Sequence, residues 1–188
     1  MTFTLERRGL ELRFRQVRLA ARQWLTPSYV RVRLEGADLH GFDSPGSDDH
    51  IRIFFPDTPP ASVEELRAAP SREYTPLAWD ADEGWLDLEF AIHGDNGVAA
   101  PWAATAELGA IAGIGGPRGS MLVTGRPDGW LLAGDETAVP AMRRFAHLMD
   151  AEATGRIFVE VADEDHELPI AAPAGILVEQ VHRGGAAP

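Results

Sequence analysis

The chain contains no cysteine and no lysine among its 188 residues. Without cysteine it cannot form disulfides, bind a metal or iron–sulfur cluster through thiolates, or use a cysteine nucleophile. Without lysine it cannot form a Schiff base, and all 17 basic residues are arginines. The six histidines show no metal-ligand spacing. The sequence therefore predicts neither a disulfide framework nor a metal centre.

Long apolar runs are missing as well. No stretch reaches the roughly 18 apolar residues of a membrane-spanning helix, and no apolar run follows the arginines near the N-terminus, as it would in a signal peptide. We therefore expect a cytoplasmic protein without a membrane span. The net charge of −12 repels phosphate backbones, so a nucleic acid is not an expected partner.

Alternation of apolar and polar residues predicts an antiparallel first domain. It recurs in residues 29–34, 51–55 and 86–92, and each run is typical of a half-buried strand. Further upstream the apolar face slips by one residue near Gln16, which predicts a β-bulge. The arginines gathered in residues 1–36 are expected mainly on the solvent side of such strands, although an anionic ligand is the alternative.

Short strands punctuated by Gly, Pro and Asp are typical of a barrel rather than a helical domain. Residues 1–125 are therefore predicted to form a six-stranded antiparallel β-barrel. Two short helices interrupt it, one at residues 62–68 and one at residues 96–106, where Asn96 is the expected cap.

Residues 126–188 follow a different pattern, after a linker rich in Gly and Pro. Strand, helix, strand and strand are expected in that order, and the strands are nearly continuously apolar, as in a parallel sheet covered on both faces. The helix carries its apolar side chains at the spacing of a buried stripe. These segments predict a small α/β domain; they are 130–133, 137–149, 156–161 and 175–181.

The first candidate site is Arg72-Glu73-Tyr74-Thr75-Pro76, at the start of an expected strand. Arg72 can bind a phosphate through two parallel hydrogen bonds. Tyr74 lies two residues further, on the same face of the strand, and Thr75 places a hydroxyl on the other face. Such a set can hold a flat heteroaromatic cofactor with a pyrophosphate tail, although an Arg and a Tyr on one strand face usually just pack.

The second candidate runs from His93 to Trp102, where a strand passes through a glycine loop into a helix. Amide groups at a helix start attract anions, and Gly94 and Gly97 let the backbone approach a phosphate. The alternative is an ordinary connection in which Asn96 caps the helix.

Two further segments contain turns. Residues 115–120 form a tight turn between the last strands of the barrel. Residues 132–141 form a strand, a sharp turn and a helix that tolerates Pro140 in its first turn. Nucleotides bind at the carboxyl end of such a strand. The Gly-x-Gly-x-x-Gly fingerprint is absent, so this segment alone does not predict dinucleotide binding.

Taken in order along the chain, these segments resemble the siderophore-interacting proteins, which are flavin-dependent ferric-siderophore reductases related to the ferredoxin-reductase superfamily. The resemblance extends from about Leu12 to Gly185, and the segment Gly-Asp-Glu-Thr-Ala-Val-Pro-Ala at residues 134–141 is fairly specific to the family. The segments that carry it are residues 44–56, 72–76, 93–102, 116–120 and 134–141.

The resemblance implies an FAD site. Arg72 would bind the pyrophosphate, Tyr74 would lie against the isoalloxazine ring, and Thr75 would lie near its reactive nitrogen. His93 and the backbone of residues 97–99 (Gly97, Val98 and Ala99) would complete the contacts to the ribose and phosphates of the cofactor. The Trp102 indole would pack behind them.

It also implies sites for the donor and the acceptor of electrons. The side where NAD(P)H approaches would be bordered by Gly134, Asp135, Glu136 and Thr137. From their position and charge, Arg52 and Arg118 are candidates for attracting an anionic ferric siderophore. Arg183 is a candidate contact for the 2′-phosphate that distinguishes NADPH from NADH.

The chain departs from the family pattern in two places. Leu77 stands where the family usually has a basic residue, which removes one expected phosphate or substrate contact. The family also continues beyond residue 182 into another strand and a helix. We therefore expect a truncated α/β domain with three parallel strands and an uncovered sheet edge, which either pairs in a homodimer or accompanies a loss of nicotinamide binding.

The leading hypothesis is a ferric-siderophore reductase that passes electrons from NAD(P)H, or from a reduced ferredoxin, through FAD to Fe(III) and so releases Fe(II). The sequence does not select the donor or the siderophore. One alternative is a flavin- or siderophore-binding protein without NAD(P)H-dependent activity. Another is a general NAD(P)H:flavin reductase that releases free reduced flavin.

Overall fold

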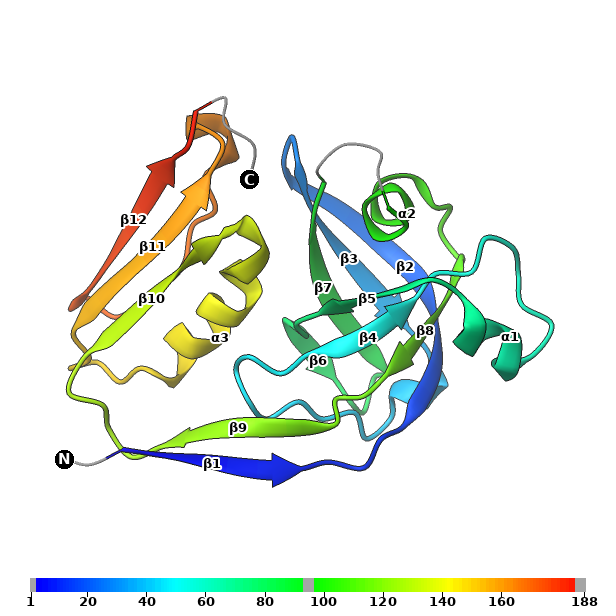
Figure 1. Ribbon diagram of the computed structural model, residues 1–188, viewed down its shortest axis with the longest axis horizontal. Coiled ribbons are helices and arrows are strands. Elements are labelled where there is room, and N and C mark those ends of the chain that lie inside the picture. The colour runs from blue at the N-terminus through cyan, green and yellow to red at the C-terminus, as the bar shows by residue number, and fades with distance from the viewer. Residues whose placement is uncertain (1–2, 93–96, 185–188) are drawn as a thin grey trace.

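The computed structural model describes residues 3–92 and 97–184 (Figure 1). Seven strands form one antiparallel sheet in the order β5-β4-β8-β2-β3-β7-β6. The predicted antiparallel domain is thus confirmed, with seven strands in this sheet in place of six. The strands are β2 (Phe14–Thr26), β3 (Tyr29–Glu35), β4 (Ile51–Phe54), β5 (Ser71–Tyr74), β6 (Ala78–Asp80), β7 (Trp85–Ala91) and β8 (Ile111–Gly115). Strand β9 (Gly119–Thr124), expected as the last strand of the barrel, pairs outside this sheet with β1 (Thr4–Gly9).

The two edge strands of this sheet are consecutive in the chain. Only residues 75–77 join the end of β5 to the start of β6, a path of at most about 15 Å. A flat sheet of this size would separate its edges by roughly 29 Å, which is six strand spacings of about 4.8 Å. The sheet therefore curls until its first and last strands come near each other, and it surrounds the core.

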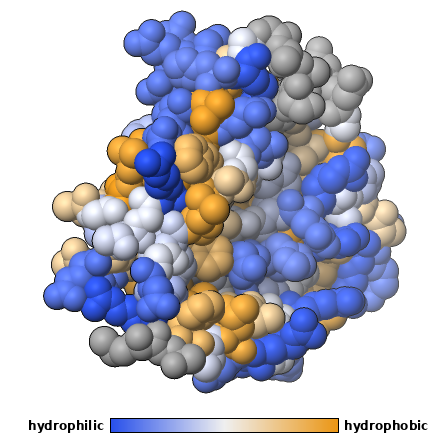
Figure 2. Space-filling model, turned by 60° about the vertical axis from the view of Figure 1, so that its left-hand side comes forward, coloured by the Kyte–Doolittle hydropathy of each residue, from blue (hydrophilic) through white to orange (hydrophobic). Residues whose placement is uncertain are grey.

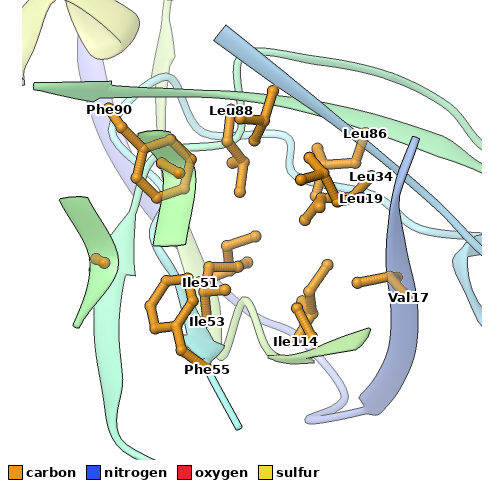
Figure 3. Close-up of a cluster of buried hydrophobic side chains, with 14 of the residues drawn as sticks. Val17, Leu19, Leu34, Ile51, Ile53, Phe55, Leu86, Leu88, Phe90 and Ile114 are labelled. Atoms are coloured by element: carbon orange, nitrogen blue, oxygen red, sulfur yellow. The ribbon is translucent and has the colours of Figure 1, made fainter. Parts of the chain in front are cut away.

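The core lies on the inner side of the curled sheet (Figure 3). The faces that alternation predicts for β3, β4 and β7 are confirmed, because every apolar member except the partly buried Ile92 is at most 2% exposed. They are Val30, Val32 and Leu34, then Ile51, Ile53 and Phe55, then Leu86, Leu88 and Phe90. Burial of these β-branched, leucine and aromatic side chains is the main stabilising contribution to the domain.

The β-bulge expected near Gln16 is wrong. Pairing of β2 with β8 runs without a shift from Phe14 to Arg18. The irregularities in β2 lie further along the strand, opposite β3, between Leu19 and Ala21 and between Trp24 and Thr26. Near Gln16 the apolar face does not slip, because Arg15 occupies the inward position at 6% exposure. Its Nη1 donates to the carbonyl of Gly116 at 2.9 Å, and its guanidinium lies 5.1 Å from the ring centre of Phe42.

Two short helices and a two-stranded ribbon complete this part of the fold. Helix α1 (Val63–Ala68) begins as predicted, after Ser62, whose side chain accepts a hydrogen bond from the Glu65 amide. Helix α2 (Ala99–Thr105) begins later than expected, with Val98 at the N-cap position; Asn96 lies outside the described residues. Strands β1 (Thr4–Gly9) and β9 (Gly119–Thr124) pair separately, along the bottom of Figure 1.

The second unit is the predicted three-stranded parallel sheet, in the order β10-β11-β12. Its α-helix, α3, lies between this sheet and the curled sheet (Figure 1). The predicted apolar stripe of α3 is buried at Val139, Met142 and Ala146. The elements are β10 (Trp130–Asp135), α3 (Val139–Leu148), β11 (Gly155–Val161) and β12 (Ile176–His182), with short 3-10 helices at Glu136–Ala138 and Glu164–His166. A further 3-10 helix, Ala37–Leu39, follows β3 in the first domain.

The expectation that this sheet is covered on both faces is wrong for the part of the chain that the structure describes. On the face away from α3, Leu131 is 72% exposed, Leu177 52% and Val181 44%. Figure 2 turns this side of the molecule forward and shows apolar groups among hydrophilic ones. The continuous apolar pattern thus reflects one face packed on α3 and one face in solvent. No helix within the described ranges is long and apolar enough to cross a membrane.

Candidate functional site

A cavity of about 420 Å³ lies where the curled sheet, the start of α2 and the start of α3 meet. Its volume is within the range of small-molecule sites. Strands β5 and β7 supply one wall, the segment before α2 supplies another, and the second unit supplies Thr137 and Pro140. The other lining residues are His50, Arg72, Glu73, Tyr74, Thr75, Glu89, Ala91, Gly97, Val98, Ala99 and Ala100. The structure therefore brings the first two predicted candidate segments to one place.

Tyr74 presents an aromatic surface to this cavity. It is half-buried, and its ring centre lies 4.1 Å from that of Phe90, which fixes its position against the core. Burial raises the pKa of the Tyr74 phenol to about 12, because a buried phenolate would lose its hydration. The phenol is therefore uncharged at neutral pH, and the ring is a flat, neutral surface suited to contact with another flat ring.

Arg72 and Thr75 flank Tyr74. The Arg72 side chain is exposed, and its Nη1 donates a 2.8 Å hydrogen bond to the carbonyl of Ser71. No carboxylate within the described residues forms an ion pair with it, so the guanidinium can bind an anionic ligand. Thr75 is the first residue after β5, in the short connection to β6, and is half-buried.

The segment before α2 approaches the cavity with its backbone. Gly97 has φ +93°, and a Cβ built there would meet nothing within 4 Å, so this part of the wall is open. Trp102 does not line the cavity; its ring packs 5.2 Å from that of Phe55. The far end of α2 is fixed by Arg22, whose Nε and Nη2 donate to the carbonyls of Ala103 and Ala106 at 2.5 and 2.6 Å. His93 lies outside the described residues.

Of the residues expected to border the nicotinamide, only Thr137 lines the cavity. A Cβ at Gly134 would lie 2.7 Å from that of Ala138, so this glycine allows β10 to pack closely against the start of the helical segment. Asp135 accepts hydrogen bonds from the amide and hydroxyl of Thr137 at 2.9 and 2.5 Å, and so orients that residue.

Glu136 is held by an ion pair within the second unit. Arg183, which follows β12, donates to both of its carboxylate oxygens at 2.8 and 2.6 Å. The side chains of Arg183 and Glu136 are 9% and 8% exposed. Arg183 is thus part of a buried ion pair that shapes the loop after β10, where the sequence suggested a contact to a nucleotide phosphate.

Sequence patterns missed Glu89. Alternation along β7 placed it on a polar face, yet its side chain is 0% exposed and it belongs to the cavity wall. Its oxygens accept hydrogen bonds from Tyr29, Arg31 and Arg143. Only the pairing of β3 with β7 and the position of α3 reveal this cluster, because its members are far apart in the sequence.

A second cavity of about 770 Å³ adjoins the first, and His50 and Glu73 line both. Arg52 and Arg118 line it, as do Arg13 and Arg67. Arg52 donates to Glu73 at 2.8 Å, and this hydrogen bond lowers the pKa of the Glu73 carboxyl. The structure thus groups both predicted arginines beside the first cavity, around the aromatic rings of Phe14 and Phe54.

Two family models match the chain. The siderophore-interacting FAD-binding domain matches residues 18–121, and the siderophore-interacting protein model matches residues 127–188. Together they include both walls of the first cavity.

Known relatives agree with these matches. The chain is 33% identical over 184 residues to an uncharacterised protein of Mycobacterium bovis, covering 90% of this chain and 65% of that protein. It is 38% identical over 145 residues to the NADPH-dependent ferric-chelate reductase of Escherichia coli, covering 71% of this chain and 56% of the relative.

A solved structure supports the same relationship. The siderophore utilization protein from T. fusca superimposes with a TM-score of 0.86 at 34% identity, covering 100% of this chain and 75% of that one. With respect to the Mycobacterium bovis relative, the chain spans about two thirds of its length, since it covers 65% of that protein. On these matches and this architecture, the chain belongs to the siderophore-interacting protein family.

Proposed function

We propose that this chain binds FAD in the first cavity and acts as a ferric-siderophore reductase, with NAD(P)H as the electron donor. The observation that carries the proposal is the composition of the cavity wall. An exposed guanidinium, a neutral aromatic ring and a hydroxyl from β5 and its end face an open glycine segment, and Thr137 closes the site from the second unit. Those groups match the tail, the ring and the donor side of a flavin dinucleotide.

Each proposed flavin contact has a definite task. Arg72 holds the pyrophosphate with charge-assisted hydrogen bonds, while the backbone of Gly97, Val98 and Ala99 approaches the same end of the ligand. Tyr74 and Thr75 hold the ring end. Trp102 supports α2 from behind, through its contact with Phe55. When bound, FAD supplies the ability to take two electrons at once and release them singly.

We assign flavin binding to residues 1–125 and the approach of the donor to residues 126–188. Gly134 and the Asp135–Thr137 hydrogen bonds hold Thr137 at the cavity, and the Arg183–Glu136 pair fixes the loop between them. The task of these residues is to present a defined surface on the side of the cavity opposite β5. Water is thereby excluded from the space between donor and flavin.

The acceptor side is proposed at the second cavity. Arg52 and Arg118, with the neighbouring arginines, give this part of an acidic protein a local positive charge. That charge attracts an anionic ferric chelate. Reduction to Fe(II) weakens the binding of hard oxygen ligands, so iron is released. The ferric-chelate reductase of Escherichia coli is a named relative with this kind of activity.

The test begins with flavin retention. The purified protein is mixed with FAD and desalted, and visible absorbance is recorded for wild type, Arg72→Ala and Arg156→Ala. Arg156 is a matched control because it is an exposed arginine on the far sheet, paired with Glu179. We expect wild type and Arg156→Ala to retain flavin and Arg72→Ala to lose about tenfold or more in FAD affinity, as for one lost charge-assisted contact.

The donor and acceptor are then tested anaerobically. Rapid bleaching of bound flavin by NADPH or NADH, followed by reoxidation with a ferric siderophore, supports the proposal. Retained flavin that neither nucleotide bleaches indicates a binding protein, or a ferredoxin-dependent enzyme if reduced ferredoxin bleaches it. Weak, exchangeable flavin with no preference for iron chelates indicates a general flavin reductase. A wild-type protein that stays colourless overturns the proposal.

A further inference from the structure

Glu89 is the point at which three elements meet beside the first cavity. Oε1 of Glu89 accepts from Nε and Nη2 of Arg31 at 3.1 and 2.6 Å. Nη1 of Arg143, on α3, donates to both carboxylate oxygens at 2.5 and 2.6 Å. The hydroxyl of Tyr29 donates to Oε2 at 3.1 Å. One fully buried carboxylate thus joins β3 and β7 to the helix of the second unit.

The charges in this cluster do not balance. Arg31 and Arg143 carry two positive charges, and Glu89 carries one negative charge. Burial of Tyr29, together with the neighbouring Glu89 carboxylate, raises the pKa of the Tyr29 phenol well above its ordinary value, so the phenol is neutral. Arg143 is 15% exposed and Arg31 34%, so solvent screens the excess positive charge only in part.

The neighbouring pair on the same two strands is balanced. Arg33 and Asp87 face each other across β3 and β7, as Arg31 and Glu89 do two residues away. Nε and Nη2 of Arg33 each donate to an Asp87 oxygen at 2.8 Å. Asp87 does not line the cavity, and its ion pair with Arg33 leaves no excess charge among the described residues. The two pairs occupy equivalent positions across β3 and β7, but they differ in charge balance and in their distance from the cavity.

We propose that the Arg31–Glu89–Arg143 cluster sets the charge of the cavity wall and so favours the reduced form of a flavin bound there. The inference rests on the proposed function, because it needs flavin in the first cavity. A flavin that takes up two electrons and one proton gains one negative charge. A net positive charge in the wall stabilises that form relative to the oxidised one, as charge near a flavin ring does in general.

The test measures the midpoint potential of bound FAD by anaerobic reduction against a reference dye. The variants are Glu89→Gln, Arg143→Met and, as the matched control, Asp87→Asn. Glu89→Gln removes one negative charge from the wall and is expected to shift the potential upward. Arg143→Met removes one positive charge and is expected to shift it downward. Each changes the ratio of the Kd values for oxidised and reduced FAD by about tenfold, the size expected for a unit charge roughly 10 Å away at an effective dielectric of about 20.

Opposite shifts separate this role from a structural one. Both variants break the same ion pair, so a cluster that merely joins the two units would move the potential in one direction or not at all. Either result overturns the inference, and so does a shift in Asp87→Asn equal to that in Glu89→Gln. Where Arg143→Met does not fold, Arg31→Met makes the same charge change at the same carboxylate. A wild type that binds no FAD refutes the proposed function itself, whereas FAD binding without these shifts refutes the inference alone.

Discussion

Arg144 on α3 fastens the second unit to the curled sheet at a site separate from Glu89. Its Nη1 donates to the Ser44 hydroxyl and to the carbonyl of Pro76, each at 3.1 Å, and its Nη2 donates to the carbonyl of Ser44. The guanidinium also lies 5.1 Å from the ring centre of Trp79. Ser44 is fully buried, so water cannot replace the lost donors there. We predict that Arg144→Met destabilises the protein markedly.

The magnitude follows from the groups left behind. Two carbonyl oxygens lose a charged donor, at about 1–3 kcal/mol each, and the cation–π contact contributes about 1 kcal/mol. The methionine keeps part of the packing and avoids the burial of a charge, which offsets part of the loss. We expect a decrease of about 3 kcal/mol in the free energy of unfolding, or about 6–12 °C in Tm for a chain of this length.

Urea unfolding followed by circular dichroism measures this decrease. Arg126→Met is the control, since Arg126 forms ion pairs with the exposed carboxylates of Asp150 and Glu152. Solvent-exposed ion pairs contribute little, so we expect the control to unfold like wild type. A loss below about 1 kcal/mol for Arg144→Met, the size of a single ordinary hydrogen bond, would refute the assignment of α3 docking to this arginine.

Two further predictions concern ionisation and backbone. The protein has only two tyrosines, and burial raises the pKa of Tyr74 to about 12 and that of Tyr29 well above its ordinary value. Both folded-state pKa values exceed the unfolded value of about 10. The stability contributed by the two buried phenols is therefore complete below about pH 10 and is lost as the pH rises from about 10 toward 12. Ultraviolet absorbance should show no tyrosinate in the folded protein at about pH 10, and its appearance there would contradict the burial argument. Gly155→Ala places a Cβ 2.0 Å from the Trp130 carbonyl oxygen and should lower the free energy of unfolding by more than about 4 kcal/mol. Gly109→Ala has open space around it and should lower it by only about 1–2 kcal/mol, because of the positive φ at this position. Equal decreases in thermal unfolding experiments would count against the clash.

Features that depend on residue spacing within one segment could be predicted from the sequence. The alternation in β3 and β7 identified their buried faces, and the spacing of Val139, Met142 and Ala146 identified the packed side of α3. The run from Arg72 to Thr75 and the segment around Gly97 were expected at one ligand site, and the structure places both in the wall of one cavity. Local spacing sufficed for the buried faces because each lies within one element, whereas the meeting of the two segments at one site was implied by the resemblance to the siderophore-interacting proteins.

Features that depend on pairing between distant segments could not be predicted. Arg15 looks like a surface residue until β2 turns its side chain inward toward Gly116. Glu89 looks like the polar half of an alternating strand until Arg31 and Arg143 converge on it. Leu131 looks like a core residue because its strand is apolar throughout, yet it is 72% exposed. In each case the partner, or its absence, is set by the tertiary arrangement.

The connection between β5 and β6 gives the proposed flavin site a mechanical role. These edge strands are not paired with each other in the sheet order, so the curled sheet has an open seam, bridged by residues 75–77. Tyr74 and Thr75 stand at that seam, and both line the first cavity. A ligand held there supplies contacts where ladder hydrogen bonds are missing. The bound cofactor would then bridge the two edge strands, so cofactor binding would be coupled to the stability of the curled sheet.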